Sequence, residues 1–397
     1  MMPRIALVTP MLPVPHDQTR GRYIHETARA LSQLAQVRVF FQQASYPRIP
    51  GLSPRSFLRG EVGEDYTLDG VDVEAFTYPA LPGLSRATNG WMASRALVPR
   101  MRRFEPDLVL AYWVYPDGAA AKRAARRLGV PCIVGARGSD IHVRTGLNAH
   151  LTRRTLQGLD AILTVSHAMR DTAIATFGAD PERVHPVVNG IDTDVFHPRD
   201  RQAMRSKLGV PADARLITYV GRFVEAKGMR ELLQAFQSLA GQDPRVRLAL
   251  VGDGVMREEL ASLVQATGLA GRVTMTGGLE PAQVAEWIGA SDVLTLPSWS
   301  EGYPNVVVEG IACGRPVVAT AVGGTGEIIK AGNGILVPPR DAAALERGLA
   351  DALARTWDAA AVSASVSRGW GDVAADTLAI CRQVLGVSDG DVCLGRA

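Results

Sequence analysis

The fold of this chain is decided by the stretch Leu296-Pro-Ser-Trp-Ser-Glu-Gly-Tyr-Pro-Asn-Val-Val-Val-Glu-Gly-Ile-Ala-Cys-Gly-Arg-Pro-Val-Val-Ala-Thr320. The apolar run at 293–296 predicts a buried parallel strand, and residues 298–305 read as the loop at its carboxyl end. A helix is predicted over 306–313, before the next strand. Units of this kind build doubly wound α/β sheets, which bind ligands at the carboxyl ends of their strands.

Two carboxylates in this stretch are separated by seven residues. Glu301 lies in the loop, and Glu309 lies about one turn into the helix, where it can still face the ligand crevice. The backbone N–H groups of Gly302, Tyr303 and Asn305 lie at the start of the helix, at the positive end of its dipole. A carboxylate with aligned amides suits sugar hydroxyls, and a second carboxylate suits a ribose diol. The spacing therefore indicates a nucleotide-sugar site; the alternative is two glutamates that only face solvent and favour the helix dipole.

A second stretch reads as strand, tight turn and helix. Gly221 ends the strand at 216–220 without a side chain, so that phosphates can approach the backbone. Arg222 and Lys227 place two cations at the mouth of the same crevice. A departing diphosphate gains negative charge as its glycosidic bond breaks, so fixed cations stabilise the transition state most. The alternative, an exposed Arg and Lys near a helix start, is weakened because cations there oppose the dipole.

Both stretches closely resemble the retaining GT-B glycosyltransferases of family 4, also called glycosyl transferases group 1. The resemblance implies that Glu301 contacts the donor sugar near its third hydroxyl and Glu309 binds the ribose. It implies that Arg222 and Lys227 bind the diphosphate and, with Glu301, carry the catalysis. The implied reaction moves a hexosyl unit from a UDP- or GDP-sugar to a saccharide or lipid-linked acceptor in bacterial polysaccharide or glycolipid biosynthesis. Neither a metal nor another cofactor is expected, since the motifs contain no Asp-x-Asp, paired histidines or cysteine cluster.

Two weaker pieces of the same resemblance involve glycine turns. Gly21 stands where family members have a Gly-Gly turn that admits the donor phosphates and the acceptor; the alternative is a plain helix-start glycine. Glu327 ends a glycine loop at 322–327 that borders the donor site in the family. Its alternative is a loop in which a glutamate caps a helix start.

The string Arg137-Gly-Ser-Asp140 departs from the family, in which many members carry His-Gly-x-Asp. A branch acting on polysaccharide precursors carries an arginine there, so the chain resembles that branch. Arg137 can only hydrogen-bond or neutralise charge, because an arginine is no general base at neutral pH. We expect Arg137 and Asp140 on the acceptor or sugar side, with Asp140 either orienting Arg137 or capping the next helix. His142 favours a surface or packing role.

Apolar strands alternate with helical patterns along the chain, which predicts two Rossmann-like, doubly wound parallel-sheet domains facing a cleft. The expected domains are 1–191 on the acceptor side and 192–370 on the donor side, followed by a helix at 371–386 that crosses back and a flexible tail at 387–397. The expected strands of the first domain are 4–9, 37–41, 71–77, 108–111, 132–135, 161–164 and 184–188. Those of the second are 216–220, 246–251, 273–276, 293–296, 317–320 and 335–337.

Composition fits such an enzyme. The chain has 397 residues, too many for one core, and a net charge of +3, which argues against nucleic acid as a partner. The N-terminal sequence has neither a signal peptide nor a spanning helix, so a cytoplasmic location is expected. Peripheral contact with the inner face of the membrane is predicted from basic clusters, the alternative being ordinary solvated helix faces. These clusters are Arg100, Arg102, Arg103, Lys122, Arg123, Arg126, Arg127, Arg153 and Arg154.

Two other functions are open at this stage. A nucleotide-sugar 2-epimerase has the same fold, although the Glu-x7-Glu spacing and the Gly-Arg…Lys-Gly pattern argue against it. A non-catalytic nucleotide-sugar binder is the second, suggested by Arg137 in place of histidine.

Overall fold

The computed structural model describes residues 2–14, 20–47, 65–81, 84–141 and 145–387. The chain divides into two compact units. Unit 1 comprises Met1–Gly190 and Trp370–Ala397, and unit 2 comprises Ile191–Gly369. His142 and the predicted tail, apart from Val387, lie outside the described residues.

Unit 1 is built on a sheet of eight strands in the order β3-β4-β2-β1-β5-β6-β7-β8. All neighbours are parallel except β3 and β4. The strands are β1 (Arg4–Thr9), β2 (Gln36–Ser45), β3 (Tyr66–Leu68), β4 (Val71–Pro79), β5 (Leu108–Tyr112), β6 (Cys132–Ala136), β7 (Ala161–Thr164) and β8 (Val184–Pro186). The seven strands predicted for this unit are confirmed, with small differences at their ends.

The antiparallel strand β3 was not predicted from the sequence. It joins β4 through a two-residue turn in which Asp69 and Gly70 have φ values of +47° and +82°. Asp-Gly is a preferred pair for such a hairpin turn because both residues need positive φ. The signal was therefore present in the sequence, although β3 is only three residues long.

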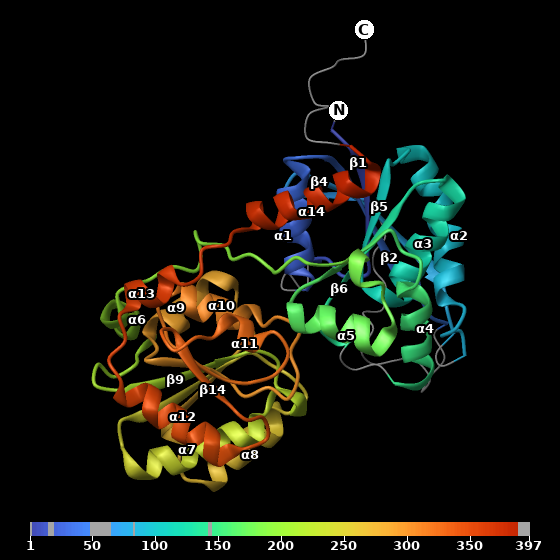
Figure 1. The fold of residues 1–397 in the computed structure, drawn as a ribbon. Helices are drawn as coiled ribbons and strands as arrows, with labels where there is room; N and C mark the ends of the chain where they lie inside the picture. The colour runs from blue at the N-terminus through green and yellow to red at the C-terminus, as the bar shows by residue number, and fades with distance from the viewer. Residues whose placement is uncertain (1, 15–19, 48–64, 82–83, 142–144, 388–397) are drawn as a thin grey trace. The chain divides into compact units, whose positions relative to one another are not determined.

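Helices cover both faces of the unit 1 sheet, which is why β5 and β6 are apolar and fully buried. In Figure 1, α1 and α14 lie on one side of the strands, and α2 and α3 lie on the other. The helices are α1 (Arg22–Ser32), α2 (Asn89–Phe104), α3 (Ala119–Leu128), α4 (Gly146–Leu156), α5 (His167–Phe177) and α14 (Trp370–Leu385). The apolar side chains of α14, from Trp370 to Cys381, belong to the same core cluster as Ile5 and Leu7 of β1.

Unit 2 is built on a parallel sheet of six strands in the order β11-β10-β9-β12-β13-β14. The strands are β9 (Arg215–Val220), β10 (Val246–Val251), β11 (Val273–Gly277), β12 (Val293–Leu296), β13 (Val317–Thr320) and β14 (Gly334–Val337), so the second predicted series is confirmed. The helices are α6 (Arg201–Leu208), α7 (Met229–Gln242), α8 (Arg257–Ala266), α9 (Pro281–Ala290), α10 (Asn305–Ala312), α11 (Thr325–Ile328), α12 (Ala342–Ala354) and α13 (Ala359–Ala364). Figure 1 shows α7, α8 and α12 on one face of this sheet and α9 and α10 on the other.

The strand orders define where ligands are expected. In unit 2, the strands that follow β9 in the chain are added on one side of it, and those from β12 onward are added on the other side. In unit 1 the direction changes in the same way between β1 and β5. At such a topological switch point, the loops that leave the two central strands diverge to opposite faces of the sheet. The crevice between those loops is the place where doubly wound sheets bind ligands.

The basic residues of the unit 1 helices do not all face water as predicted. Lys122 is 9% exposed, and its ammonium donates to the backbone carbonyls of Arg154, Thr155 and Gln157. Burial, followed by the charge of Arg126, lowers its pKa to about 8. The expectation of a solvated Lys122 was therefore wrong, because the end of α4 supplies the carbonyl groups that this lysine needs when it is buried.

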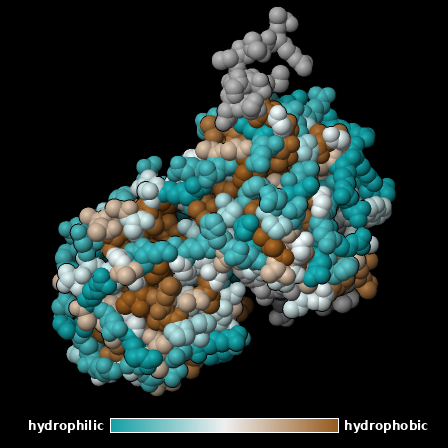
Figure 2. Space-filling view, in the orientation of Figure 1, coloured by the Kyte–Doolittle hydropathy of each residue, from teal (hydrophilic) through white to brown (hydrophobic). Residues whose placement is uncertain are grey.

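One face of the molecule is seen in Figure 2. Figure 2 shows hydrophilic side chains over most of the face in view, with smaller apolar patches between them. None of the helices in the described residues combines the length and the apolar composition that crossing a membrane requires.

Candidate active site

The loops after β9 and β12 are held together by a close backbone contact. Gly228 has a φ of +67°, and a Cβ atom placed on it would lie 2.1 Å from the carbonyl oxygen of Pro297. Only glycine fits this contact without displacing one of the two loops. The backbone N–H of Trp299 also donates to the carbonyl of Ala226 at 2.8 Å. Lys227, which precedes Gly228, is thereby placed next to the loop that carries Glu301.

Lys227 and Glu301 form an ion pair at this junction. The distance from Lys227 Nζ to Glu301 Oε1 is 2.5 Å, and the two side chains are 22% and 12% exposed. The sequence predicted both residues as catalytic, one for the leaving group and one for the donor sugar, but it did not predict that they contact each other. Each charge is partly removed from water, so the pair is worth more than an exposed surface ion pair.

The loop after β13 holds Glu301 from the other side. Gly323 has a φ of +50°, and a Cβ atom there would lie 1.8 Å from the carbonyl oxygen of Glu301. The backbone N–H of Gly324 donates to the carbonyl of Gly302 at 3.0 Å. Glu301 is therefore fixed between two loops, one from β9 and one from β13, before any ligand binds.

Glu327 lies on α11, next to Tyr303 in electrostatic terms. Burial and then the carboxylate of Glu327 raise the pKa of Tyr303 to about 12, while Arg368 acts in the opposite direction. Glu327 is therefore close enough to Tyr303, in the loop that carries Glu301, to act on it electrostatically; its place beside a donor stays a prediction.

Glu309 lies deeper than Glu301. It is 6% exposed in the middle of α10, and Asn305, in the first turn of that helix, is 8% exposed. A carboxylate at this depth keeps its charge only where hydrogen bonds or cations compensate for lost water. The two glutamates thus occupy different environments, one at the mouth of the loop and one beneath it.

Gly221 and Arg222 follow β9. The backbone N–H of Gly221 donates to the carbonyl of Val251 at 2.9 Å, so the loop after β9 stays paired with the end of β10. The side chain of Arg222 is exposed and forms no hydrogen bond or ion pair with any residue that the structure describes. This cation is therefore available to a ligand at the carboxyl edge of the sheet.

The loop after β10 was not predicted as part of the site. Its residues Gly252-Asp253-Gly254 lie against the loop after β9, since Phe223 N–H donates to the carbonyl of Asp253 at 2.8 Å. The signal that could have revealed this loop is the Gly-x-Gly that directly follows a buried apolar strand.

Three further side chains near Glu301 were also missed. Trp299 donates from Nε1 to Glu231 Oε1 at 2.9 Å. The hydroxyl groups of Ser298 and Thr325 are fully buried and have no hydrogen-bond partner among the described residues. Buried hydroxyl groups without a partner are uncommon; Ser298 lies in the loop that carries Glu301, and Thr325 is the first residue of α11. No sequence pattern distinguishes them from ordinary loop residues.

In unit 1, Arg137 lies at the end of β6. Its Nη1 donates to Asn189 Oδ1 at 2.6 Å, and its guanidinium lies 4.4 Å from the centre of the Tyr112 ring. The carboxylate of Asp140, which is fully buried, accepts the backbone N–H groups of Arg137 at 2.7 Å and Val114 at 3.0 Å. Asp140 therefore shapes the turn after β6 and fixes it to the segment after β5, and it does not hold the guanidinium of Arg137 by those bonds.

Gly21 precedes α1 with a φ of +64°, and a Cβ atom there would lie 2.4 Å from the carbonyl carbon of Met11. The packing of the residues after β1 thus accounts for this glycine without a ligand. It nevertheless lies at the switch point of the unit 1 sheet, as the loop after β1 requires.

Comparison with known proteins identifies the family of this chain. Residues 21–195 match the model of the family described as Glycosyltransferase Family 4, and residues 200–363 match that of Glycosyl transferases group 1. TuaC of Bacillus subtilis, a glycosyltransferase assigned to teichuronic acid biosynthesis, is 31% identical over 304 residues, which is 74% of this chain and 75% of TuaC. The chain belongs to glycosyltransferase family 4.

Other relatives match a larger share of this glycosyltransferase. D-inositol 3-phosphate glycosyltransferase 2 of Catenulispora acidiphila is 30% identical over 388 residues, covering 89% of this chain and 87% of that protein. The solved structure of HepE from Anabaena, in complex with UDP and glucose, matches 97% of this chain and 99% of its own with a TM-score of 0.71 at 19% identity. The structural likeness shows the fold, which is the GT-B fold predicted from the sequence.

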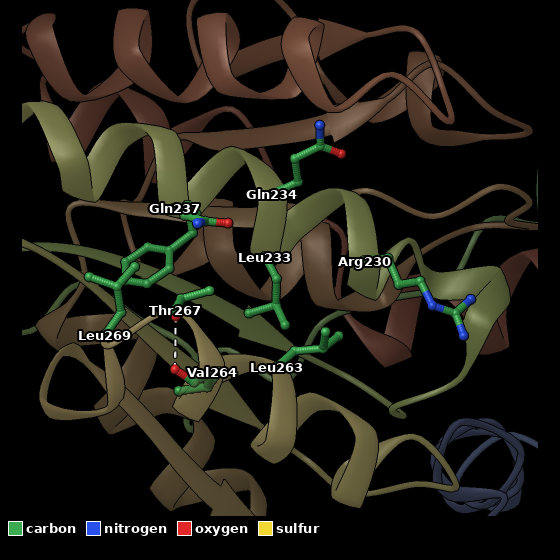
Figure 3. A pocket seen from close by; sticks show the side chains of 9 residues that line it. Arg230, Leu233, Gln234, Gln237, Leu263, Val264, Thr267 and Leu269 are labelled. Atoms are coloured by element: carbon green, nitrogen blue, oxygen red, sulfur yellow. Dashed lines mark hydrogen bonds between the residues drawn. The ribbon is translucent and has the colours of Figure 1, made fainter.

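A cavity of about 220 Å³ lies away from these loops, between α7, α8 and the segment that follows α8 in unit 2. Figure 3 shows Leu233 of α7 and Leu263 of α8 pointing into it, with Arg230 at its edge. Its lining contains none of the residues predicted for the donor site of this glycosyltransferase. Arg230 is already paired with Glu225 and Glu259.

Within the described residues, no three His, Cys, Asp or Glu side chains gather in a way that could hold a metal ion. The positive charges at the candidate donor site of this glycosyltransferase are side chains, Arg222 and Lys227.

A buried carboxyl group lies behind the segment after β5 in unit 1. Asp117 is 2% exposed and accepts a hydrogen bond from Gln42 Nε2 at 2.8 Å. Burial raises its pKa from 3.8 to about 7, against the opposing effects of Gln42 and Arg86. The sequence gives no sign of this role for Asp117, because a lone aspartate after a proline is typical of an ordinary turn.

The Asp117 carboxyl group gives a stability prediction with a definite sign. The folded protein keeps this proton up to about pH 7, whereas the unfolded chain releases it near pH 4, so stability falls as the pH rises between those values. Asp117→Asn removes the ionisation and should raise the free energy of unfolding more at pH 8 than at pH 5. The stabilisation by Asn should be larger at pH 8 than at pH 5 by at most about 3 kcal/mol, at about 1.4 kcal/mol for each of the two pH units between pH 5 and the folded pKa of about 7. Denaturant unfolding at both pH values measures it, with the exposed Asp171→Asn as a control; equal effects at both pH values would contradict the assignment.

Proposed function

We propose that this glycosyltransferase moves a hexosyl unit, with retention of anomeric configuration, from a UDP- or GDP-sugar to a saccharide or lipid-linked acceptor. The observation that supports it most is the Lys227–Glu301 ion pair at the β9/β12 switch point, because one residue suits a diphosphate and the other suits sugar hydroxyls. Glu309 is buried in α10, the helix that follows the same loop, and a carboxylate suits a ribose diol.

In the proposed reaction, the bond between the anomeric carbon and the diphosphate oxygen breaks and a bond to the acceptor oxygen forms. The electron pair stays on the diphosphate, whose charge Arg222 and Lys227 stabilise. The proton of the acceptor hydroxyl passes to a leaving phosphate oxygen. Glu301 binds the donor sugar and Glu309 binds the ribose. The backbone N–H groups of Gly302, Tyr303 and Asn305 complete the donor site together with Gly221, which has no side chain to obstruct the phosphates, and Glu327 and Gly21 lie at its borders.

The names of the relatives bear on donor and acceptor. HepE was solved with UDP and glucose, which supports a UDP-hexose as the first donor to test. TuaC is assigned to teichuronic acid synthesis, which supports a polysaccharide acceptor and a role in exopolysaccharide assembly. The inositol phosphate glycosyltransferases support a small soluble acceptor instead.

Incubation with a panel of UDP- and GDP-sugars tests the proposal. A transferase releases the nucleoside diphosphate slowly to water and quickly when an acceptor is present. A nucleotide-sugar 2-epimerase instead changes the sugar, and a non-catalytic binder protects the donor without any turnover. No release from any donor, with or without acceptors, would contradict the proposed function.

We propose that no metal takes part. Activity is therefore expected to survive excess EDTA with less than a twofold change, because Arg222 and Lys227 carry the charge that a divalent ion would otherwise supply. The measurement is nucleoside diphosphate release with and without the chelator. Loss of transfer that Mg²⁺ or Mn²⁺ restores would show that the donor site needs a metal.

We further propose a cytoplasmic enzyme in peripheral contact with the inner face of the membrane, through unit 1. Several large apolar side chains of this unit are exposed, among them Leu84 at 84%, Leu147 at 54% and Trp91 at 39%. Exposed arginines remain at 102, 123, 126, 127, 153 and 154, whereas Arg100 and Arg103 pair with Glu74. Apolar side chains together with cations suit an anionic lipid surface.

Salt should separate the two kinds of acceptor. Raising ionic strength screens exposed arginines, so transfer to an acceptor in anionic vesicles should fall several-fold while transfer to its soluble analogue changes little. Initial rates in low and high NaCl measure this, with neutral vesicles as the control. The same salt dependence for both acceptors would argue against the membrane contact.

A further inference from the structure

Two arginines at the carboxyl edge of the unit 1 sheet use their side chains for hydrogen bonds and ring contacts with neutral groups and form no ion pair among the described residues. Arg137 contacts Asn189 and the Tyr112 ring, and its Nε–H is buried without a hydrogen-bond partner. Among the described residues it has no ion pair with a carboxylate. A guanidinium that is mostly removed from water and has no anionic partner costs free energy, which an anion from outside would recover.

Arg86, between β4 and α2, is in the same situation. Its Nε donates to Asn148 Oδ1 at 2.7 Å, and its guanidinium lies 5.3 Å from the centre of the Tyr115 ring. Its backbone carbonyl also accepts a hydrogen bond from the Tyr115 hydroxyl. No carboxylate in the described part of the chain pairs with it.

The segment after β5 connects these two arginines. The Val114 N–H is bonded to Asp140, in the turn that carries Arg137, while Tyr115 contacts Arg86. The segment begins at Trp113, a partly exposed residue with a φ of +83°, which is strained for a non-glycine residue. It leaves the sheet at the β1/β5 switch point, where a ligand of this unit is expected.

The acidic groups nearby do not neutralise this edge. Asp140 is fully buried and is bonded to backbone N–H groups, and Asp117 is 2% exposed and bonded to Gln42. Burial raises the pKa of Asp117 to about 7, so its negative charge is incomplete at neutral pH. Neither of these buried carboxyl groups forms an ion pair with Arg86 or Arg137, so the positive charge of the two arginines is left for a ligand.

We propose that this edge of unit 1 binds a carboxylate or a phosphate carried by the acceptor, with Arg137 as the main contact and Arg86 beside it. The fork of N–H donors on an arginine matches either oxyanion in a bidentate manner, which no neutral sugar hydroxyl can do. The inference rests on the proposed function, because it takes the bound group to be part of the acceptor. It narrows the acceptor to an acidic saccharide or a sugar phosphate.

Calorimetric titration without any donor tests the proposal. Three probes share one sugar ring: methyl glucoside, methyl glucuronide and glucose 6-phosphate. The wild-type protein should bind at least one anionic probe tenfold or more tightly than the neutral one, and the tighter of the two identifies carboxylate or phosphate. Arg137→Gln should lower the affinity for that anion by about 10- to 100-fold, as expected for the loss of a charged hydrogen bond.

Two controls make the test specific. Arg153→Gln changes an exposed arginine of α4 that donates only to the carbonyl of Thr176, and it should keep the wild-type preference. Arg137→Lys keeps the positive charge but loses the forked pair of N–H donors. Its affinity for the anionic probe should lie between those of the wild type and Arg137→Gln. If the melting temperature shows that Arg137→Gln is unfolded, Arg86→Gln replaces it in the same titrations.

Equal binding of all three probes, or a preference that survives in both glutamine variants, would overturn the inference. A matching loss of UDP affinity in Arg137→Gln would also overturn it, because the arginine would then belong to the donor side. The proposed function is tested separately by nucleoside diphosphate release from wild-type protein, so its failure cannot be confused with failure of the acceptor site.

Discussion

Lys227→Ala is expected to lower kcat/KM for transfer by about 30- to 1,000-fold, the loss of about 2–4 kcal/mol of transition-state stabilisation that one preorganised charged donor provides. The lysine is held in place by the Gly228–Pro297 contact and lies 2.5 Å from Glu301, so the protein has already fixed its position before a donor arrives. Steady-state kinetics with the best donor of the panel measures the loss. Arg222→Ala should act in the same direction.

The matched control for this experiment is Arg230→Ala. Arg230 lies three residues further along the chain, is exposed, and pairs with Glu225 and Glu259 outside the proposed site. Its removal should change kcat/KM by less than twofold, and circular dichroism should show that both variants are folded. Near wild-type turnover by Lys227→Ala and Arg222→Ala would refute their role at the leaving group.

Glu301→Gln should separate two effects that usually change together. Transfer should fall by about 100-fold or more, because the donor sugar loses a charged hydrogen-bond acceptor. Affinity for the free nucleoside diphosphate should rise several-fold, because Lys227 no longer shares its charge with a carboxylate and the diphosphate meets a free cation. The ion pair thus predicts that Glu301 weakens product binding, which assists release after transfer.

Glu309→Gln provides the contrast. If the Glu309 carboxylate accepts hydrogen bonds from the ribose hydroxyls, its replacement should weaken binding of the same nucleoside diphosphate by about tenfold. Glu231→Gln, which alters a nearby carboxylate that accepts the Trp299 indole N–H, should leave that affinity unchanged. Calorimetry that finds weaker product binding in Glu301→Gln would contradict the idea that the two charges compete.

Hydrophobic patterning was sufficient to predict the fold. Of the fourteen strands in the part of the chain that the structure describes, thirteen could be placed from apolar runs, because parallel strands covered on both faces are continuously apolar. The strand that was missed, β3, is short and lies at the edge of the sheet, where half-exposed residues weaken the apolar signal. Its Asp-Gly turn was the better signal.

The candidate site was only partly predictable. Strand–loop–helix spacing indicated that Lys227 and Glu301 lie at one edge of the sheet. Whether their side chains meet depends on the contact between Gly228 and Pro297, which are 69 residues apart in sequence. The sequence could not predict three buried polar side chains, those of Ser298, Thr325 and Asp117. Their burial depends on which distant segments of the chain cover them. Lys122 was misjudged for the same reason, since the carbonyl groups that receive it come from α4.

The path of the chain sets the order in which the protein can be completed. Unit 2 is one continuous segment, and its two ends lie side by side, joined by the Ile191 N–H to the Arg368 carbonyl. It can therefore close its core once residue 369 has left the ribosome. Unit 1 begins earlier but finishes later, because Trp370, Val373 and Leu378 of α14 belong to its core. Residues 1–190 therefore keep part of their apolar surface uncovered until unit 2 and α14 have been synthesised.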